Sequence, residues 1–423
     1  MSSESSSSSD EDEELSWDET LQRIKENDPR VKSIVSRRDD IQNLTDEECD
    51  DLGSDIANNT HLTEVDLSYA DEALNDHRIS LFFQGLIRSS SIIELNLEES
   101  GFGVAGVQSM VPFLQNANSL TRLGIDGSNI QSEGFNLMFR ALRDSPIEEL
   151  SCCNCGIDSI EIDTKQIPTH LKWLRLGNNG INADDCRELV KLLQRGDATL
   201  NLLALGNNKI DDEGVAILVG ALINNTSLTS LYVNGNDGIS RHGNIMLLEL
   251  VNDISSIEAT LLSNHTLEWI YVTLDEVESL NAVVEIQQQI HKATRINANF
   301  PNEERAAAKV IRTQLHSRRR AELAVLQGVN HSVYSEIDPL HLPEVLALIG
   351  HHHGQGELYI ALTYAIADLI STVNRKECIR KQMTYYAARL KELGEELAAI
   401  EAAEGGAASV GSEPRSIKRR RAC

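Results

Sequence analysis

Residues 170–237 repeat one short pattern three times, as HLKWLRLGNNGI (170–181), TLNLLALGNNKI (199–210) and SLTSLYVNGND (227–237). The first two copies read L-x-x-L-x-L-x-x-N-x-L, and the third matches as far as the asparagine. The alternation predicts a short strand with every second side chain pointing inward. The asparagine follows where the chain turns, and its amide can bond backbone groups that the strand leaves unpaired. Because one unit cannot bury its own apolar face, we expect the units to stack.

The same spacing recurs along most of the chain and is that of a leucine-rich repeat, with one strand and one helix per unit. We therefore predict an α/β fold: a horseshoe-shaped leucine-rich-repeat solenoid with parallel strands on the concave face and helices on the convex face. An all-α C-terminal region is expected to follow it. The first leucine-type positions of eight full units are Leu62, Ile92, Leu120, Ile147, Leu171, Leu200, Leu228 and Leu267.

Amphipathic segments between the strands predict the helices, most clearly over residues 183–195 and 211–224, where acidic residues in the first turn complement the helix dipole. A helix in every unit resembles the ribonuclease-inhibitor-like superfamily, over about residues 30–295. The longer interval between Leu228 and Leu267 predicts an insertion or a longer helix there.

The repeat domain is expected to span residues 28–300 and to begin with a polar capping unit. Val31, Ile34 and Ile41 keep its register, and Thr45 with Glu48 three residues later predicts a helix start. Residues 1–27 are rich in serine and acid and are predicted to be disordered. Ser7, Ser8 and Ser9 each precede an acid by three positions, which resembles a casein kinase 2 target; the alternative is a solubilising tail.

The chain has 423 residues and a net charge of -27. That charge argues against a nucleic-acid-binding protein and against binding to anionic membranes. The start MSSESSSSSDEDEE is not secretory, and no apolar run approaches the ~20 residues of a membrane span. We therefore expect a soluble, intracellular and reduced protein, either cytoplasmic or nuclear.

Two motifs imitate ligand sites. The glycines of GFGVAG (101–106), with Asp126 downstream, imitate a dinucleotide fingerprint, but acidic Glu98 and Glu99 would repel a pyrophosphate. The cysteines 152, 153 and 155 imitate a metal cluster, although two of them occupy repeat positions and no second pair lies near in sequence. With no catalytic motif either, we predict that the protein is not an enzyme and uses neither cofactor nor metal.

Outward strand positions predict a polarised concave face. Its N-terminal half is acidic, and its C-terminal half concentrates large apolar side chains in a chain with only 4% aromatic residues. Exposed aromatic residues often anchor protein partners; the alternative is that loops or the C-terminal region cover them. The predicted partner-binding residues are Trp173, Arg175, Leu202, Tyr232, Trp269, Tyr271, Glu94, Glu98 and Asp126.

Beyond the repeats we predict a helical region over residues 301–375, with His351–His353 in an interhelical loop. It resembles the tail of uncharacterised leucine-rich-repeat proteins of diatom algae. This resemblance implies kinship and says nothing about activity. Residues 376–404 carry an apolar heptad seam that predicts either a weak homodimer or packing onto the same chain. Residues 405–423 are predicted to be a disordered basic tail, in which Lys418–Arg421 resembles a nuclear import signal.

These features together favour a non-enzymatic scaffold that binds a protein partner on the concave face. One alternative is an activator of a small GTPase, because leucine-rich-repeat activators of the nuclear-transport GTPase are also acidic and act through an exposed rim asparagine. Asn178 and Asn207 would be its equivalents here. Another alternative is a substrate-recruiting or immune-receptor-like module.

Overall fold

The computed structural model describes residues 16–255, 257–272 and 280–310. The expected C-terminal helices, the histidine triplet, the heptad seam and both predicted tails beyond these ranges lie outside the described residues.

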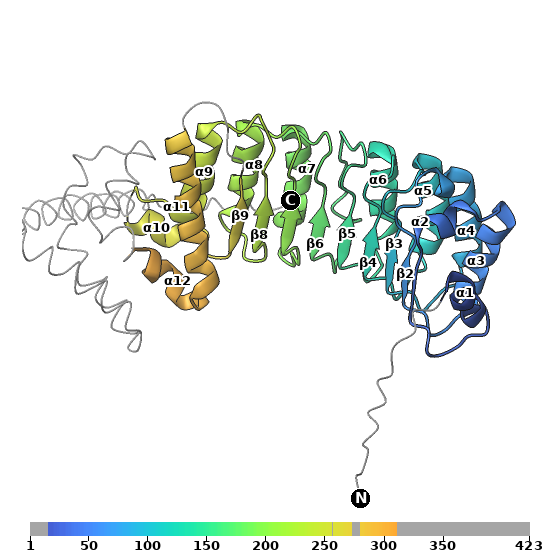
Figure 1. Ribbon diagram of the computed structural model, residues 1–423. Coiled ribbons are helices and arrows are strands. Elements are labelled where there is room, and N and C mark those ends of the chain that lie inside the picture. Colours follow the sequence, from blue (N-terminus) through green and yellow to red (C-terminus); the bar gives the residue numbers. More distant parts are fainter. Residues whose placement is uncertain (1–15, 256, 273–279, 311–423) are drawn as a thin grey trace, which may run out of the picture. The chain divides into compact units, whose positions relative to one another are not determined.

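Nine short parallel strands form one sheet in sequence order, so each repeat unit pairs only with the units before and after it. This arrangement confirms the predicted solenoid, and every strand lies where the leucine spacing places it (Figure 1). The strands are β1 (Ser33–Val35), β2 (Glu64–Asp66), β3 (Glu94–Asn96), β4 (Arg122–Gly124), β5 (Glu149–Ser151), β6 (Trp173–Arg175), β7 (Leu202–Ala204), β8 (Ser230–Tyr232) and β9 (Trp269–Tyr271).

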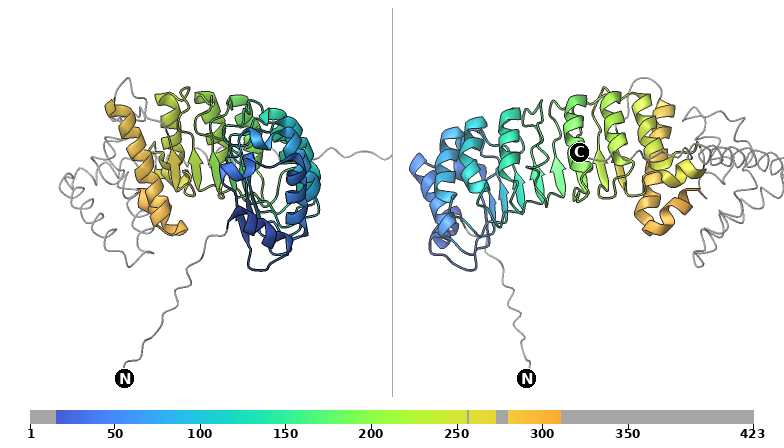
Figure 2. Two further views of the ribbon diagram at one scale, coloured as in Figure 1. Left: turned by 45° about the vertical axis from the view of Figure 1, so that its right-hand side comes forward. Right: turned by 180° about the vertical axis from the view of Figure 1, so that it is seen from behind.

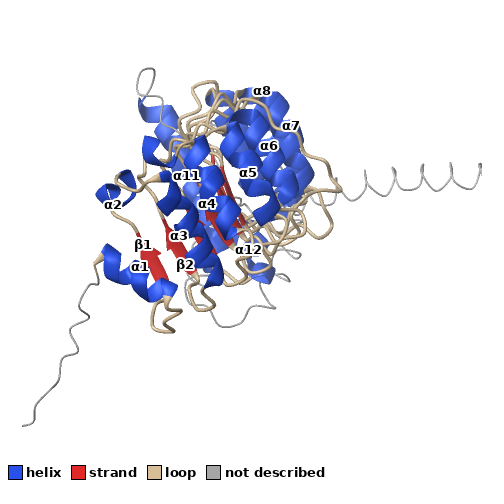
Figure 3. Ribbon diagram, turned by 90° about the vertical axis from the view of Figure 1, so that its right-hand side faces the viewer, coloured by secondary structure: helices blue, strands red, loops and turns tan. Residues whose placement is uncertain are grey.

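Helices form a second layer on one side of the sheet and leave its other side uncovered along the middle units (Figures 1 and 2). Viewed along the array, α5 to α8 stack behind one another on that side (Figure 3). The helices are α1 (Trp17–Lys25), α2 (Arg38–Gln42), α3 (Asp46–Asn58), η1 (Glu72–Leu74), α4 (Asp76–Leu86), α5 (Val104–Leu114), α6 (Gln131–Ala141), α7 (Ala183–Leu193), α8 (Asp212–Leu222), α9 (Arg241–Asn252), α10 (Ile257–Leu262), α11 (Leu280–Asn299) and α12 (Asn302–Lys309).

The core lies between the two layers and is built from the inward leucine positions. Leu174, Leu203 and Leu231 are aligned on adjacent strands, and all three are fully buried. Burying each such side chain stabilises the fold by about 1.5–3 kcal/mol. Because the aligned leucines come from different units, this stabilisation exists only when the units are stacked.

The asparagines that recur at the same position of successive units share one hydrogen-bond pattern. Asn208 Oδ1 accepts from the backbone N–H groups of Asn179 and Ile181 in the preceding unit, both at 3.1 Å. Its Nδ2 donates to the carbonyls of Leu176 and Leu205, at 2.9 and 3.1 Å. Asn179 and Asn236 repeat this arrangement one unit before and one unit after. Each asparagine therefore links two units through groups that would otherwise be buried without partners.

The expectation of a helix in every unit is wrong for the unit that begins at Ile147. Leu171 lies only 24 positions after Ile147, and an extended segment replaces the helix between β5 and β6. Ile160 and Ile162 alternate inward there and fill the space of the missing helix. Their backbone N–H groups donate to the carboxylates of Asp185 and Glu188 on α7, both at 2.8 Å. The unit is too short to contain a helix. The carboxylates of α7 therefore accept the hydrogen bonds that its backbone N–H groups would otherwise lack.

The N-terminal cap starts earlier than residue 28, so the predicted disorder of residues 1–27 is wrong for residues 17–25, which form α1. Ser16 and Glu19 make a capping box, and Ile24 is buried against the repeats. Asn59 donates to the Ile24 carbonyl at 3.0 Å and ties α1 to the end of α3. The acidic composition of this segment had predicted disorder. The helix is nevertheless stable because it packs one face, which holds Ile24, against the rest of the fold. The predicted capping box of Thr45 with Glu48 does start α3.

At the other end, the insertion expected after Leu228 is the short helix α10, and α11 closes the array by packing on α9 and β9. Helix α12 also belongs to this end, although a boundary at residue 300 would separate it from the repeats. Lys309 on α12 is fully buried, and its Nζ donates to the carbonyls of Val251 and Asn264 at 2.5 and 2.8 Å. Any shortened chain should therefore keep α12.

Leu203→Ala and Leu202→Ala test the register, because these adjacent residues of one strand face opposite sides of the sheet. Leu203 is fully buried, so its truncation should lower the free energy of unfolding by ~2–5 kcal/mol. Leu202 faces outward and is half-buried, so its truncation should cost about 1 kcal/mol or less. Urea denaturation followed by circular dichroism measures both. Equal losses would show that the assignment of strand faces is wrong.

His265 predicts an acid-sensitive end of the repeat array. Burial, with Lys309 and Arg305 nearby, lowers the pKa of His265 from its ordinary value of 6.5 to about 4. The unfolded chain therefore binds this proton more readily than the folded chain. The free energy of unfolding should be fully present above pH 6.5 and should fall as the pH drops from 6.5 towards 4.

The variant His265→Gln isolates this contribution, because glutamine can keep a hydrogen bond to the Leu261 carbonyl but cannot be protonated. Urea denaturation at pH 7 and pH 5 should show a smaller loss of stability for the variant than for the wild-type protein. Identical losses would assign the acid sensitivity to other groups.

Candidate protein-binding site on the strand face

The strand face, defined as the outward side chains of β1 to β9 and of the turns that follow them, has two aligned rows. In the first row, Trp173 on β6 lies beside Leu202 on β7, and Ser230 on β8 lies beside Trp269 on β9. In the second row, Ala204 lies beside Tyr232, and Tyr232 lies beside Tyr271. Strand spacing of ~4.8 Å places Trp173 about 14 Å from Trp269 along the first row. The structure therefore brings the predicted apolar residues onto four consecutive strands.

The aromatic corner at β8 and β9 carries the most exposed of the predicted apolar residues. Trp269 and Tyr271 retain 52% and 59% of their accessible surface, whereas Tyr232 and Trp173 are half-buried. The rings of Tyr232 and Tyr271 are 6.0 Å apart, and the Trp269 ring lies 6.1 Å from the imidazole of His291 on α11. These contacts restrict the motion of the rings, while Trp269 and Tyr271 keep more than half of their surface exposed. A side chain that is already restricted loses less conformational entropy on binding.

Two ion pairs join neighbouring strands on the strand face, one within the first row and one between the two rows. Arg122 forms an ion pair with Glu94, and Arg175 forms one with Glu149. Sequence reasoning missed Arg122, although the strand register places it directly beside Glu94. Glu94 and Arg175 are therefore presented on this face as halves of ion pairs and not as single charges.

An acidic strip follows the strands at their carboxyl ends. Asp126 accepts hydrogen bonds from the Ser151 hydroxyl at 2.7 Å and from the Cys153 N–H at 2.6 Å, so one of its oxygens has a structural role. Glu98 extends over Gly124, where a Cβ would lie 3.1 Å from its Oε1. Partial burial, together with the nearby Asp126 and Asp66 carboxylates, raises the pKa of Glu98. The strip is therefore a region of concentrated negative charge.

The turns after β2 to β8 each place one residue in the left-handed backbone conformation, and sequence reasoning did not identify this constraint. Asn178 and Asn207 have φ values of 55° and 54°, which asparagine tolerates better than most residues. The rim asparagines considered for GTPase activation therefore have a backbone explanation. The same position is occupied by Tyr69, Glu99, Gly127, Asn154 and Gly235, all with positive φ.

The two ligand-like motifs have packing roles in this structure. A Cβ at Gly101 would lie 2.8 Å from the Asp71 carbonyl oxygen, and one at Gly106 would lie 2.8 Å from Ile79 and Phe102, so close packing accounts for these glycines. Cys152 and Cys155 are fully buried at their repeat positions. Burial raises the pKa of Cys155 to about 12, which disfavours the thiolate that a metal would need. Within the described ranges, no group of three or more His, Cys, Asp or Glu residues could hold a metal ion.

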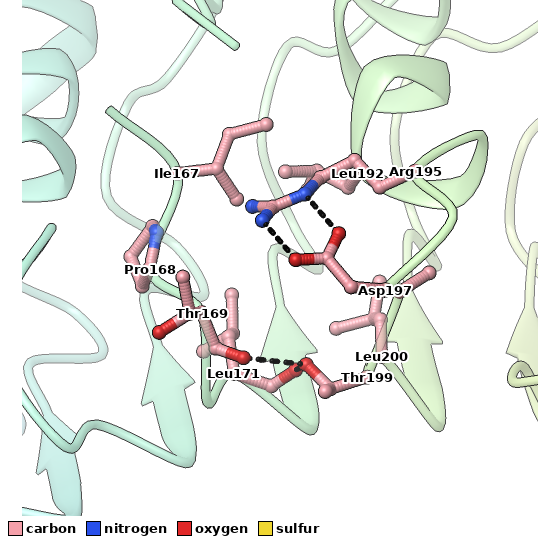
Figure 4. Close-up of a pocket in the computed structure, with 10 residues that line it drawn as sticks. Ile167, Pro168, Thr169, Leu171, Leu192, Arg195, Asp197, Thr199 and Leu200 are labelled. Atoms are coloured by element: carbon pink, nitrogen blue, oxygen red, sulfur yellow. Dashed lines mark hydrogen bonds and ion pairs between the residues drawn. The ribbon is translucent and has the colours of Figure 1, made fainter. Parts of the chain in front are cut away.

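A small cavity beside the segments that lead into β6 and β7 is not a ligand site. It measures about 10 Å³ and is bordered by Ile167, by Leu192 and by the ion pair of Arg195 with Asp197, whose N–O distance is 2.7 Å (Figure 4). That volume holds at most about one water molecule. In the part of the chain that the structure describes, no helix is long and apolar enough to cross a membrane.

Comparison with known proteins agrees with the geometry. A leucine-rich-repeat family model matches residues 58–71 and 197–218. The chain folds as a leucine-rich-repeat solenoid. No curated protein matches the sequence.

The solved structures that match include two that are similar at low level. A chain titled leiomodin-1 actin-binding site 2 is 20% identical, with a TM-score of 0.28, over 32% of this chain and 78% of that chain. The tropomodulin C-terminal domain of Caenorhabditis elegans is 9% identical, with a TM-score of 0.20, over 66% of this chain and 92% of that chain. Neither likeness carries information about the partner of the solenoid.

Proposed function

We propose that the protein is a non-enzymatic scaffold that binds a protein partner through the strand face of β6 to β9. The observation that carries this proposal is the aromatic corner, where Trp269 and Tyr271 are more than half exposed on a sheet edge buttressed by α11. Exposed aromatic side chains held by a rigid scaffold are typical interface anchors. Leu202 and Trp173 extend the same apolar surface towards the acidic half of the face.

The charges and the apolar area of the strand face indicate which side chains a partner should present to it. An apolar centre would cover the aromatic corner, and basic residues would lie opposite Glu98 and Asp126. Arg175 lies between these two regions, paired with Glu149, and its charge lowers the pKa of Glu98 in opposition to the burial that raises it. A partner with this arrangement would bind in one orientation, because reversing it would bury the carboxylates of Glu98 and Asp126 against its apolar centre.

Trp269→Ala and Tyr271→Ala should each weaken partner binding by about 2 kcal/mol, or roughly thirtyfold in Kd, if these residues anchor the interface. Both side chains project from the sheet and contribute little to the core, so the melting temperature should change little. Ile223→Ala is the matched control, because Ile223 is 49% exposed but follows α8 on the helix side of the solenoid.

The measurement begins with affinity purification and quantitative mass spectrometry of the wild-type protein and the three variants. A captured protein whose recovery depends on Trp269 and Tyr271 is the candidate partner. It is then purified, and the Kd of its complex with the wild-type protein is measured by calorimetry. A chain ending after residue 330 keeps α12 and shows whether the repeats suffice. Equal binding by the wild-type protein and both aromatic variants would contradict the proposal.

The heptad seam of residues 376–404 lies outside the described residues, and the weak homodimer it suggests remains a proposal. Leu390→Glu with Leu397→Glu would place charges in an apolar seam, which should abolish any association. Sedimentation equilibrium of the wild-type protein at tens of micromolar should show concentration-dependent dimers. A wild-type monomer at these concentrations would refute the dimer.

We also propose an intracellular location, cytoplasmic or nuclear. It is supported by the basic residues Lys418–Arg421 and by the buried free thiols of Cys152 and Cys155, which are typical of a reducing compartment.

A further inference from the structure

A groove of about 490 Å³ lies at the N-terminal end of the solenoid, between α1, α2 and α3. These helices precede or belong to the first units of the array (Figure 3). The volume is within the ~300–1,000 Å³ of typical binding pockets. One wall of the groove is α1, the helix that residue composition had not predicted.

The floor of the groove is apolar and only partly covered. Trp17 and Leu21 lie one helical turn apart on α1, and Leu44 follows α2; all three pack on the core while remaining half-exposed. Apolar side chains left open along a groove between helices favour an occupant with its own apolar stripe.

The rim of the groove is acidic. Asp18, Asp39 and Asp51 are exposed, and among the described residues none of their carboxylates forms a hydrogen bond or an ion pair. Asp55 lies beside them, and its partial burial raises its pKa, an effect that Lys25 opposes and Asp51 reinforces. Lys25 is the one basic residue among the described residues lining the groove. The rim is therefore complementary to an occupant with several positive charges.

We propose that this groove binds a basic amphipathic helix of a protein partner, at a site separate from the strand face. One stripe of such a helix would cover Trp17, Leu21 and Leu44, and its lysine or arginine residues would reach the rim aspartates. Residues 1–15 of the chain itself contain no basic residue and do not offer this chemistry. Helix binding in an apolar groove with charged edges is a recurrent mode of protein recognition.

The test uses the full-length protein and a fluorescein-labelled synthetic 14-residue helix of leucine and lysine, with a leucine–glutamate helix as the comparison probe. Fluorescence anisotropy should detect the lysine probe only, and its binding should weaken as salt is raised. Because the whole chain is acidic, the test needs variants with matched charge. The groove variant is Asp18→Asn, Asp39→Asn and Asp51→Asn; the control variant is Glu133→Gln, Glu161→Gln and Asp237→Asn.

The groove variant should bind the lysine probe about tenfold more weakly than the control variant, because three weak ion pairs are lost. Equal weakening in both variants would mean that the probe responds to overall charge, and the proposal would be wrong. The substituted residues are exposed in both variants, so circular dichroism should show that the fold is retained.

Fluorescence of Trp17 gives a second readout that locates the probe. The chain has three tryptophans, so Trp173→Phe with Trp269→Phe leaves Trp17 as the sole one. An unlabelled lysine helix should shift the Trp17 emission to shorter wavelength, whereas the glutamate helix should not. Unchanged Trp17 emission at probe concentrations that saturate the anisotropy signal would place binding elsewhere and overturn the proposal.

The strand-face variants Trp269→Ala and Tyr271→Ala should bind the probe normally, which separates this inference from the function proposed above.

Discussion

The solenoid depends on one constraint: each unit leaves backbone groups and apolar side chains that only the adjacent unit can satisfy. In the C-terminal half, Asn179, Asn208 and Asn236 meet the backbone part of this requirement by bonding two units at once. In the N-terminal half the equivalent positions are the small residues Ala70, Ser100, Ser128 and Cys155, all buried. There the polar links between units lie at helix starts, as where Asp76 accepts from the N–H groups of Gly103 and Gly106, both at 2.7 Å. A stack joined this way is stable only as a whole.

This constraint separates stability from recognition along each strand. Inward residues such as Leu203 are determined by the stack, whereas outward residues such as Leu202 contribute little to it. The strand face can therefore carry acidic residues in one half and aromatic residues in the other without a large cost in folding. The ends of the array are different, because no further unit covers them. Helix α1 closes one end and α11 with α12 closes the other, and each closure produces a surface that the repeat pattern does not describe.

Prediction from sequence succeeded where structure is periodic. The alternation of leucines identified all nine strands, and Thr45 with Glu48 identified the start of α3. It failed where a neighbour decides the conformation. Residues 152–170 lie in a unit too short for a helix, and carboxylates of α7 bond their backbone instead. Helix α1 forms because Ile24 finds a buried place beside α3. Neither partner is adjacent in sequence, so local composition could not reveal these outcomes.

The sequence by itself determined which side chains face outward, because side chains alternate across a strand with a period of two residues. It thereby placed Trp173, Leu202, Tyr232, Trp269 and Tyr271 on one face. Only the tertiary structure decided which outward side chains are paired and which stay exposed, because each lies beside a residue about one repeat away in sequence. Glu94 and Arg175 are paired, Asp126 is engaged by the next unit, and Trp269 and Tyr271 stay open at the edge. The acidic groove also exists only in three dimensions, because packing brings together carboxylates from α1, α2 and α3 that no single stretch of sequence contains.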